Sequence, residues 1–244
     1  MKLGKLPAAP RPTDLEFKAY LRGSLPQYPK EFGHETNIGD FGMLGNDKVG
    51  DCTIAGAAHE HMIWTTEGFA PTPFSDAGVI ADYSAISGYD PTDPSTDIGC
   101  DVHDVMAYRK DTGLIDAAGN RHKIAAYLSL DPGNLDHLLL AAYLFGTVGI
   151  GIQFPDSAMD QFNNGLPWDY VDGATIEGGH YIPLVARRGN LVVVTWGTTQ
   201  QMTPTFFTRY CDECWCMVSV DMMLNGKSPE GFNLLQLQED LNAL

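Results

Sequence analysis

The sequence predicts an α+β fold, with a helix-forming stretch in the first half of the chain and a strand-forming stretch in the second. Residues 52–64 are rich in good helix formers and place apolar residues near helical spacing. Residues 177–197 contain an apolar run, a turn at 187–190 and a β-branched run that ends in Trp-Gly. The chain has 244 residues, of which 44% are hydrophobic, so it can bury a sizeable core as one domain or as two lobes.

The first 13 residues contain Pro7, Pro10 and Pro12 and predict an extended arm. Neither this arm nor any later segment has an apolar run long enough for a signal peptide or a membrane span. We therefore expect a cytoplasmic protein without a membrane partner.

One cysteine stands at the predicted start of the first long helix. Asp51 is a plausible N-cap residue, which makes Cys52 the first helical residue. There the sulfur would face unpaired backbone N–H groups and the positive end of the helix dipole, and both favour the thiolate over the thiol. Cys52 is therefore a candidate nucleophile. The alternative is a small buried cysteine that packs as an alanine would.

A histidine follows two glycines at the start of the strand-forming stretch. His180 lies 128 positions after Cys52 (180 − 52), close to the separation of about 130–150 residues between nucleophile and histidine in papain-like enzymes. The order also agrees, because the cysteine opens a helix in the first half and the histidine opens a strand in the second. The two residues form a candidate catalytic pair.

With several further positions, this pair resembles the papain-like cysteine peptidase family over nearly the whole chain. Asn46 stands six residues before Cys52, where the family carries the glutamine that helps to form the oxyanion hole. Gly50 and Asp51 stand where the family has Gly-Ser before its cysteine. Trp196, which is followed by a glycine, resembles the tryptophan that shields the catalytic histidine. Four longer segments resemble those of the family in their order: 74–83, 98–114, 134–154 and 160–170.

The resemblance implies a papain-like fold of two lobes with a cleft between them. The implied parts are an N-terminal arm with the segment leading into the fold at 1–45, a helical lobe with Cys52 at 46–145, a β-rich lobe with His180 at 146–225, and a tail at 226–244. Leucines near helical spacing after Gly231 predict a short amphipathic helix in that tail. Only about 50 residues precede Cys52, so we expect no long inhibitory prosegment.

The third catalytic position departs from the family pattern. The family has an asparagine two positions before the tryptophan, and this chain has Val194, which cannot orient an imidazole by a hydrogen bond. Thr195, Asp172 and Glu177 are alternatives for that role. Without such a group, the site would act as a Cys-His dyad or would not turn over.

The substrate cleft also departs from the pattern, because the family's Gly-Gly pair is absent after Gly99 and Cys100. That absence counts against binding of a long substrate by strand pairing. The aromatic residues in 155–172 are candidates for a substrate wall, although the anchor of a packed loop is the more common role. The acidic, proline-rich residues 90–97 predict a solvated connector.

The cysteines favour a reducing compartment. In the family, a disulfide commonly joins the Gly-Cys turn to a cysteine three residues before the nucleophile, and that position is Val49 here, so Cys100 lacks its usual partner. The cluster at 211–216 could hold zinc, but it has no second paired knuckle and alternates like one face of a strand. We therefore expect buried free thiols, no metal and no cofactor. His59 and His61 are expected to be structural.

The formal net charge of −16 argues against nucleic acid or an anionic membrane as a partner, since both attract basic surfaces. No phosphate-binding or dinucleotide motif is present in the sequence. The acidity is expected to serve solubility.

The function that we predict is acyl transfer by a cysteine hydrolase of papain type. Cys52 would attack a carbonyl of a peptide or protein substrate, His180 would pair with the thiolate and protonate the leaving group, and Asn46 would help to hold the oxyanion. Hydrolysis of a peptide or isopeptide bond follows from the resemblance. The alternative is a catalytically weakened papain-like module that binds a partner or serves as a subunit of a larger assembly.

Overall fold

The computed structural model describes residues 1–12, 14–21, 27–219 and 221–222 of the chain. Its α-helices are α1 (Cys52–Glu67), α2 (Asp76–Ser87), α3 (Val102–Asp111), α4 (Leu135–Phe145), α5 (Asp156–Asn163) and α6 (Pro204–Tyr210). Short 3-10 helices span Phe17–Tyr20, Glu35–Asn37 and Pro94–Thr96. The strands are β1 (Glu31–Gly33), β2 (Leu114–Ile115), β3 (Arg121–His122), β4 (Ile124–Ser129), β5 (Val148–Pro155), β6 (Ile176–Arg188), β7 (Asn190–Thr195), β8 (Thr198–Met202) and β9 (Cys211–Ser219).

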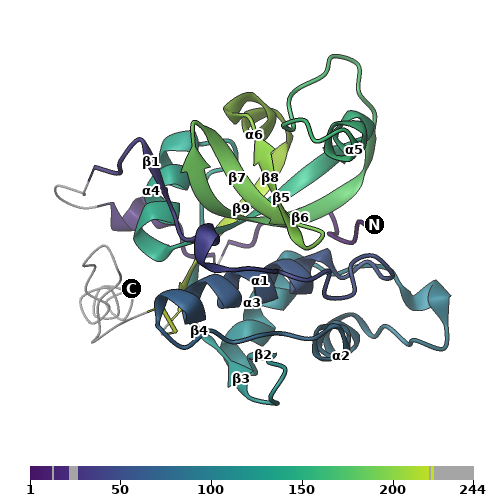
Figure 1. The fold of residues 1–244 in the computed structure, drawn as a ribbon. Helices are drawn as coiled ribbons and strands as arrows, with labels where there is room; N and C mark the ends of the chain where they lie inside the picture. Colours follow the sequence, from purple (N-terminus) through teal and green to yellow (C-terminus); the bar gives the residue numbers. More distant parts are fainter. Residues whose placement is uncertain (13, 22–26, 220, 223–244) are drawn as a thin grey trace.

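The elements form two parts that meet along α1 (Figure 1). The part drawn above α1 holds most of the main sheet with α4, α5 and α6, and the part drawn below it holds α2, α3, the hairpin β2–β3 and the sheet's strand β4. The predicted α+β fold, with a helical and a strand-rich part, is therefore confirmed. No helix among the described residues combines the length and apolar character that a membrane crossing requires.

The main sheet has seven strands, in the order β4-β9-β5-β6-β7-β8 with β1 added on β6, and all its pairings are antiparallel. The long strand β6 pairs with both β5 and β7, and its register places His180 opposite Ile152. The sheet differs from the predicted division at residue 145, because β4 precedes that boundary and yet pairs with β9. The strand-rich part therefore also draws on residues of the predicted helical lobe.

Helix α1 is the common element of both parts, and 13 of its 16 residues are buried. On one side it packs on β6, where Gly56 comes so close to Tyr181 that an added Cβ would lie 2.7 Å from the ring. On another side Ile54 and Ala58 belong to the apolar cluster that includes Val79. A helix covered from two sides has no need of a broad polar face, which is why the sequence of α1 is apolar around most of its circumference.

Most predicted elements appear where the sequence places them. The helix α1 begins at Cys52, the turn between β6 and β7 is at Gly189 with φ +75°, and α4 is followed by β5. The segment 155–172 is more regular than expected, because α5 occupies its first half. Within it, Trp168 is fully buried and stacks on Phe206, so this aromatic is a packing anchor. The predicted tail at 226–244, with its amphipathic helix, lies outside the described residues.

Candidate functional site

Cys52 is the first residue of α1, as predicted, and its residue is only 2% exposed. Asp51 occupies the N-cap position, but its side chain makes no capping hydrogen bond. Its carboxyl group lies beside Gly45 instead, where an added Cβ would be 2.8 Å from Oδ2. Burial raises the pKa of Asp51 to about 8. Asp51 is therefore the N-cap residue, as predicted, but its buried carboxyl group does not cap the helix.

His180 lies on β6 and is 1% exposed. Its Nε2 is 2.8 Å from Oγ1 of Thr195, at the end of β7. Of the three residues that the sequence offered for orienting the imidazole, Thr195 makes this contact. Within the described part of the chain, neither Asp172 nor Glu177 forms a hydrogen bond with His180.

The ring of Trp196 stacks on the imidazole of His180, with centroids 4.7 Å apart and planes at 21°. This placement depends on the turn between β7 and β8. Trp196 and Gly197 form its two central residues, and both have positive φ, +46° and +74°. A two-residue hairpin with positive φ at both positions suits the twist of its strands, but this conformation is uncommon for a residue with a side chain. The turn thus holds the indole over the histidine as the family resemblance implies.

Asn46 is buried and its Nδ2 donates to the carbonyl of Val49 at 3.2 Å. Next to it, the N–H of Gly50 donates to Oδ1 of Asp97 at 2.9 Å. The hydroxyl of Tyr83 donates to the same oxygen at 2.7 Å. Asp97 therefore holds the turn that leads to the cysteine, a role that the sequence did not reveal because residues 90–97 looked like a solvated connector.

The fold brings Asn46, Cys52, His180 and Trp196 around one small cavity. The cavity has a volume of about 10 Å³, which is close to the space that a single water molecule needs. His180 lines this cavity, and its Nδ1 is buried without a hydrogen-bond partner among the described residues. The thiol and the imidazole thus share a cavity without being hydrogen-bonded to each other.

Burial decides the charge state of this pair. Burial raises the pKa of Cys52 to about 12, and backbone groups of Tyr181 and Gly4 oppose this only in part. Burial likewise lowers the pKa of His180 to about 3. Near neutral pH the described state therefore holds a thiol and a neutral imidazole. The expectation that the helix start would favour the thiolate is not met here, since loss of hydration outweighs the helix dipole.

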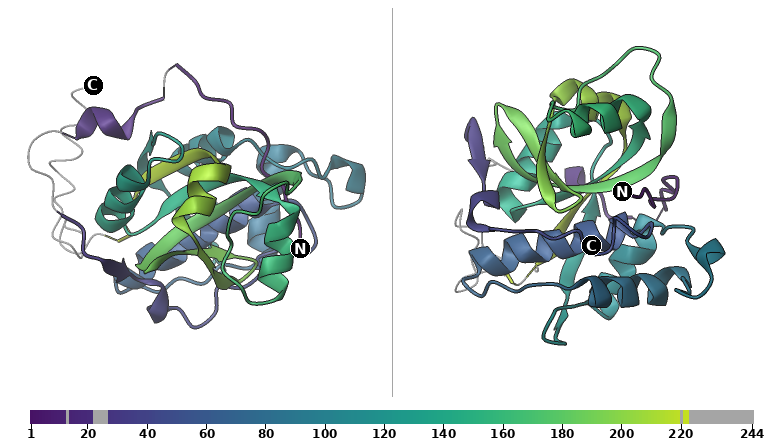
Figure 2. Two further views of the ribbon diagram at one scale, coloured as in Figure 1. Left: turned by 90° about the horizontal axis from the view of Figure 1, so that it is seen from above. Right: turned by 45° about the vertical axis from the view of Figure 1, so that its right-hand side comes forward.

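Residues 2–6 of the N-terminal arm explain why the pair is buried. Gly4 and Lys5 both donate their backbone N–H to the carbonyl of Gly179, at 3.2 and 3.1 Å. On the other side, the N–H of Cys100 donates to the carbonyl of Gly4 at 2.8 Å, and Leu6 donates to Cys100 at 3.0 Å. We call the space between Cys100 and Gly179 the inter-lobe groove. The right-hand view of Figure 2 shows the N-terminus between the sheet and α1.

The pairing with Cys100 bears on the expectation about strand pairing, which concerned a substrate and not this arm. Loss of the family's Gly-Gly pair counted against strand pairing, yet an extended segment of this chain pairs with the backbone of Cys100. The pairing needs only the N–H and the carbonyl of that one residue. Gly99, just before it, allows the close approach.

Three glycines form walls of the inter-lobe groove. A Cβ added to Gly99 would lie 2.1 Å from the carbonyl oxygen of Gly4, and one added to Gly179 would lie 2.2 Å from that of Lys5. At Gly50 the distance to the carbonyl oxygen of Leu3 would be 2.9 Å. Such distances leave no space for a side chain. The groove therefore admits an extended peptide backbone between walls that lack side chains.

Lys5 anchors the arm. Its side chain is fully buried, and Nζ lies 3.0 Å from a carboxylate oxygen of Asp212 and 2.9 Å from one of Glu213. Although burial alone would lower it, these two carboxylates hold the pKa of Lys5 above its usual value. A buried lysine is stable only when it is paired in this way. No sequence pattern indicates this contact, because its partners are more than 200 positions apart.

The remaining cysteines form no site of their own. Cys214 and Cys216 are buried free thiols of the sheet core, and Cys211 is a partly buried free thiol on the same strand. Cys100 is also a free thiol. A cavity of about 570 Å³ lies under residues 8–20, but none of the predicted site residues lines it.

The sequence matches no protein-family model and no curated protein sequence. Its fold is similar to that of solved cysteine proteases. Xylellain, a cysteine protease from Xylella fastidiosa, is 15% identical, with a TM-score of 0.67 over 89% of this chain and 96% of that one. A cysteine protease from Carica candamarcensis, solved in complex with E-64, is 11% identical, with a TM-score of 0.57 over 79% of this chain and 99% of that one.

A digestive procathepsin L 3 from the larval midgut of Tenebrio molitor is also similar. It is 12% identical, with a TM-score of 0.57 over 79% of this chain and 71% of that one. The chain thus has the papain-like fold that its sequence predicted.

Proposed function

We propose that the protein is a cysteine hydrolase of papain type, which acts by acyl transfer through Cys52 and His180 once the N-terminal arm has left the inter-lobe groove. The observation that supports this most is the hydrogen bond between Nε2 of His180 and Thr195. We assign the proton of the neutral imidazole to Nε2, which donates it to the hydroxyl, so the lone pair lies on Nδ1. Nδ1 is buried at the cavity that Cys52 also lines.

The chemistry follows from this tautomer. His180 accepts the thiol proton of Cys52 on Nδ1, and the thiolate attacks the carbonyl carbon of the substrate to give a tetrahedral intermediate. The imidazolium then gives that proton to the leaving amine, and an acyl-enzyme remains on the sulfur. Water, deprotonated by the same imidazole, releases the acid and restores the thiol. Asn46 can hold the oxyanion only if its amide gives up the carbonyl of Val49.

Departure of the arm is a condition for this chemistry. With the arm in place, burial keeps the thiol and the imidazole neutral, and the cavity holds no more than one water molecule. Exposure to water reverses both shifts, because hydration favours the charged forms. The pKa of the thiol then falls and that of the imidazole rises, which favours proton transfer between them.

The substrate class that we propose is an extended peptide, cleaved at a peptide or isopeptide bond. The groove accepts the backbone of residues 2–6 through the carbonyl of Gly179 and both backbone groups of Cys100. Its glycine walls exclude side chains near the backbone. An extended peptide from another protein could use the same backbone groups after the arm has left.

The test is the rate of alkylation of Cys52 by iodoacetamide as a function of pH, with the modified residue identified by mass spectrometry. Lys5→Ala loosens the arm, and Lys18→Ala, which removes an exposed lysine, is the matched control. We expect fast alkylation of Cys52 in Lys5→Ala that persists well below the ordinary thiol pKa of about 8.5 and disappears when His180→Ala is added. The proposal fails if Cys52 in Lys5→Ala reacts no faster than a free thiol at any pH.

A second candidate function is that of a papain-like binding or structural module. It is favoured by the neutral, buried pair and by the amide of Asn46, which is already hydrogen-bonded within its own turn. In that case alkylation in Lys5→Ala would not depend on His180, and peptides would bind in the groove without being cleaved. A fluorogenic peptide library, incubated with Lys5→Ala and with its His180→Ala double variant, distinguishes the two functions.

A further inference from the structure

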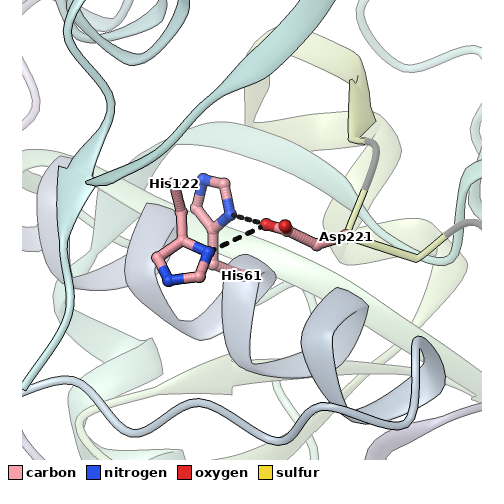
Figure 3. Close-up of side chains that lie close together, drawn as sticks. All are labelled: His61, His122 and Asp221. Carbon is pink, nitrogen blue, oxygen red and sulfur yellow. Dashed lines mark hydrogen bonds and ion pairs between the residues drawn. The ribbon is translucent and has the colours of Figure 1, made fainter. Parts of the chain in front are cut away.

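A cluster of two histidines and one aspartate lies away from the inter-lobe groove (Figure 3). His61 comes from α1, His122 from β3, and Asp221 from the two described residues that follow β9. The Nδ1 atoms of His61 and His122 lie 3.2 and 3.1 Å from Oδ2 of Asp221. Figure 3 shows both rings turned toward this carboxylate.

A fourth residue fixes the tautomer of one ring. The carboxylate of Asp116 accepts N–H groups of Ala118 and Asn120, each at 2.8 Å, and its Oδ2 lies 3.2 Å from Nε2 of His122. His122 therefore donates from Nε2, and a neutral ring has its lone pair on Nδ1. A carboxylate behind the distal nitrogen is the usual outer partner of a histidine that binds a metal.

In this arrangement a lone pair of a neutral His122 faces a lone pair of Asp221. Nδ1 of neutral His122 and the carboxylate oxygen of Asp221 are both acceptors, only 3.1 Å apart. Such a contact is repulsive unless positive charge lies between the atoms, as a proton or as a cation. His61 places a second nitrogen beside the same oxygen, and its ring is fully buried.

We propose that His61, His122 and Asp221 bind a zinc ion through the two Nδ1 atoms and Oδ2. Zinc bonds to nitrogen and oxygen of about 2.0–2.2 Å place tetrahedral ligands roughly 3.3 Å apart. The observed separations of 3.2 and 3.1 Å fit this, and all three ligand atoms lie within 4.8 Å of one another. Two imidazoles with one carboxylate favour a transition metal over calcium or magnesium. Water can complete the shell, since the side chains of His122 and Asp221 are 15% and 21% exposed.

The zinc ion would be structural. It joins α1, the hairpin β2–β3 and the chain after β9, which belong to both parts of the fold. His61 follows Cys52 by nine positions (61 − 52), about two and a half helical turns, so the two side chains leave α1 on opposite sides and roughly 14 Å apart along its axis. This inference is therefore independent of the proposed hydrolase activity. It differs from the expectation that the chain binds no metal and that His61 has only a packing role.

Calorimetric titration of the EDTA-treated full-length protein with zinc chloride tests the proposal. We expect saturable binding of a single zinc ion and a melting temperature that rises with zinc concentration. Asp221→Asn and His122→Gln should each lower the affinity by more than about 100-fold. Asp116→Asn, which keeps all three ligands, should lower it by about 10-fold to 100-fold. The matched control is Asp14→Asn, which removes the carboxylate that contacts another histidine, His103, at 2.7 Å and should leave zinc binding unchanged.

Cobalt(II) distinguishes the histidine cluster from the five free cysteines. Tetrahedral cobalt bands without sulfur charge-transfer absorption are expected in the wild-type protein and should be lost in Asp221→Asn, which retains every cysteine. Three results would overturn the proposal: no saturable zinc binding, wild-type affinity in both ligand variants, or sulfur charge-transfer bands. Circular dichroism of the metal-free variants shows whether each has folded.

Discussion

Two histidines on different sides of α1 each have a polar partner at Nε2, and we propose different chemistry for them. Nε2 of His180 contacts the hydroxyl of Thr195, and Nε2 of His122 contacts the carboxylate of Asp116. For both neutral rings we assign the proton to Nε2, which leaves the lone pair on Nδ1. The surroundings of Nδ1 differ, because that of His180 is at a small cavity without a partner, whereas that of His122 faces the carboxylate of Asp221.

The difference indicates that the group beside the unprotonated Nδ1 determines the chemistry that is open to the imidazole. Beside a thiol, the lone pair can accept a proton, which is what general base catalysis needs. Beside a carboxylate, the same lone pair requires a cation. The partners of Nε2 differ as well, since a carboxylate makes an imidazole a stronger metal ligand than a hydroxyl does.

The largest effect is expected on kcat/KM when His180 is replaced. In the Lys5→Ala background, His180→Ala should lower kcat/KM for a cleaved peptide by about 100-fold to 10,000-fold, because proton transfer to and from the sulfur is lost. Zinc affinity should not change. Steady-state assays measure kcat/KM, and calorimetry on the same preparation measures zinc affinity. A fall in zinc affinity would show that the two proposed sites are coupled.

Exchanging the distal partner of His180 should have a smaller effect. Thr195→Val keeps the shape of the side chain but leaves the buried Nε2–H without an acceptor, at a cost of about 1–3 kcal/mol, or roughly fivefold to 150-fold in kcat/KM. Thr195→Ser keeps the hydroxyl and should restore most of the rate. The pH profile of kcat/KM should move in Thr195→Val and not in Thr195→Ser. If both variants behave alike, Thr195 only packs against the ring.

A substitution in a wall of the inter-lobe groove can distinguish release of the arm from binding of a substrate. Gly179→Ala places a methyl group about where the carbonyl oxygen of Lys5 lies, at 2.2 Å in the present structure, so the arm must leave. The same methyl group obstructs any other extended backbone. We therefore expect faster alkylation of Cys52 than in the wild type, but no gain in peptide hydrolysis. Equal gains in both assays would contradict the shared use of this groove.

The last prediction concerns the pH dependence of stability, to which each buried histidine contributes. Burial lowers the pKa of His180 to about 3 and that of His59 to about 4, whereas an unfolded histidine titrates near 6.5. The unfolded chain then binds more protons, so stability falls as the pH is lowered from 6.5, by up to about 1.4 kcal/mol per pH unit for each group. Urea unfolding between pH 4 and pH 7 measures this slope. His59→Gln and His180→Gln should each reduce it, and an unchanged slope would show that these rings are hydrated.

Sequence patterns predicted that Cys52 and His180 lie at one candidate site, because the local sequence marks both residues. Cys52 follows a glycine-rich turn and opens a helix, and His180 opens a strand at a separation typical of the family. Thr195 remained one of three choices, since the register of β7 on β6 shifts at a bulge between Leu184 and Ala186. The side of a strand on which a residue lies changes with one step of register.

The other parts of the two sites depend on contacts across the whole chain. Lys5 meets Asp212 at a separation of 207 positions, and His61 meets Asp221 at 160. Neither pair lies within one helix or hairpin, so no periodicity signals it. The burial of Cys52 was also outside prediction, because it depends on where the arm lies and the sequence of the arm shows only that it is extended. Helix-dipole reasoning therefore predicted the thiolate, which burial prevents.

Because α1 is buried on both sides, its opening should require a higher free energy than the opening of the N-terminal arm. Its amides lie inside both parts of the fold, so they should exchange with solvent deuterium only through global unfolding. Gly4 and Lys5 are joined to the groove by a few backbone hydrogen bonds and one buried ion-pair cluster, so their amides should exchange through a local opening of much lower free energy. The arm is then a separate cooperative unit, which can open many times during one lifetime of the folded core.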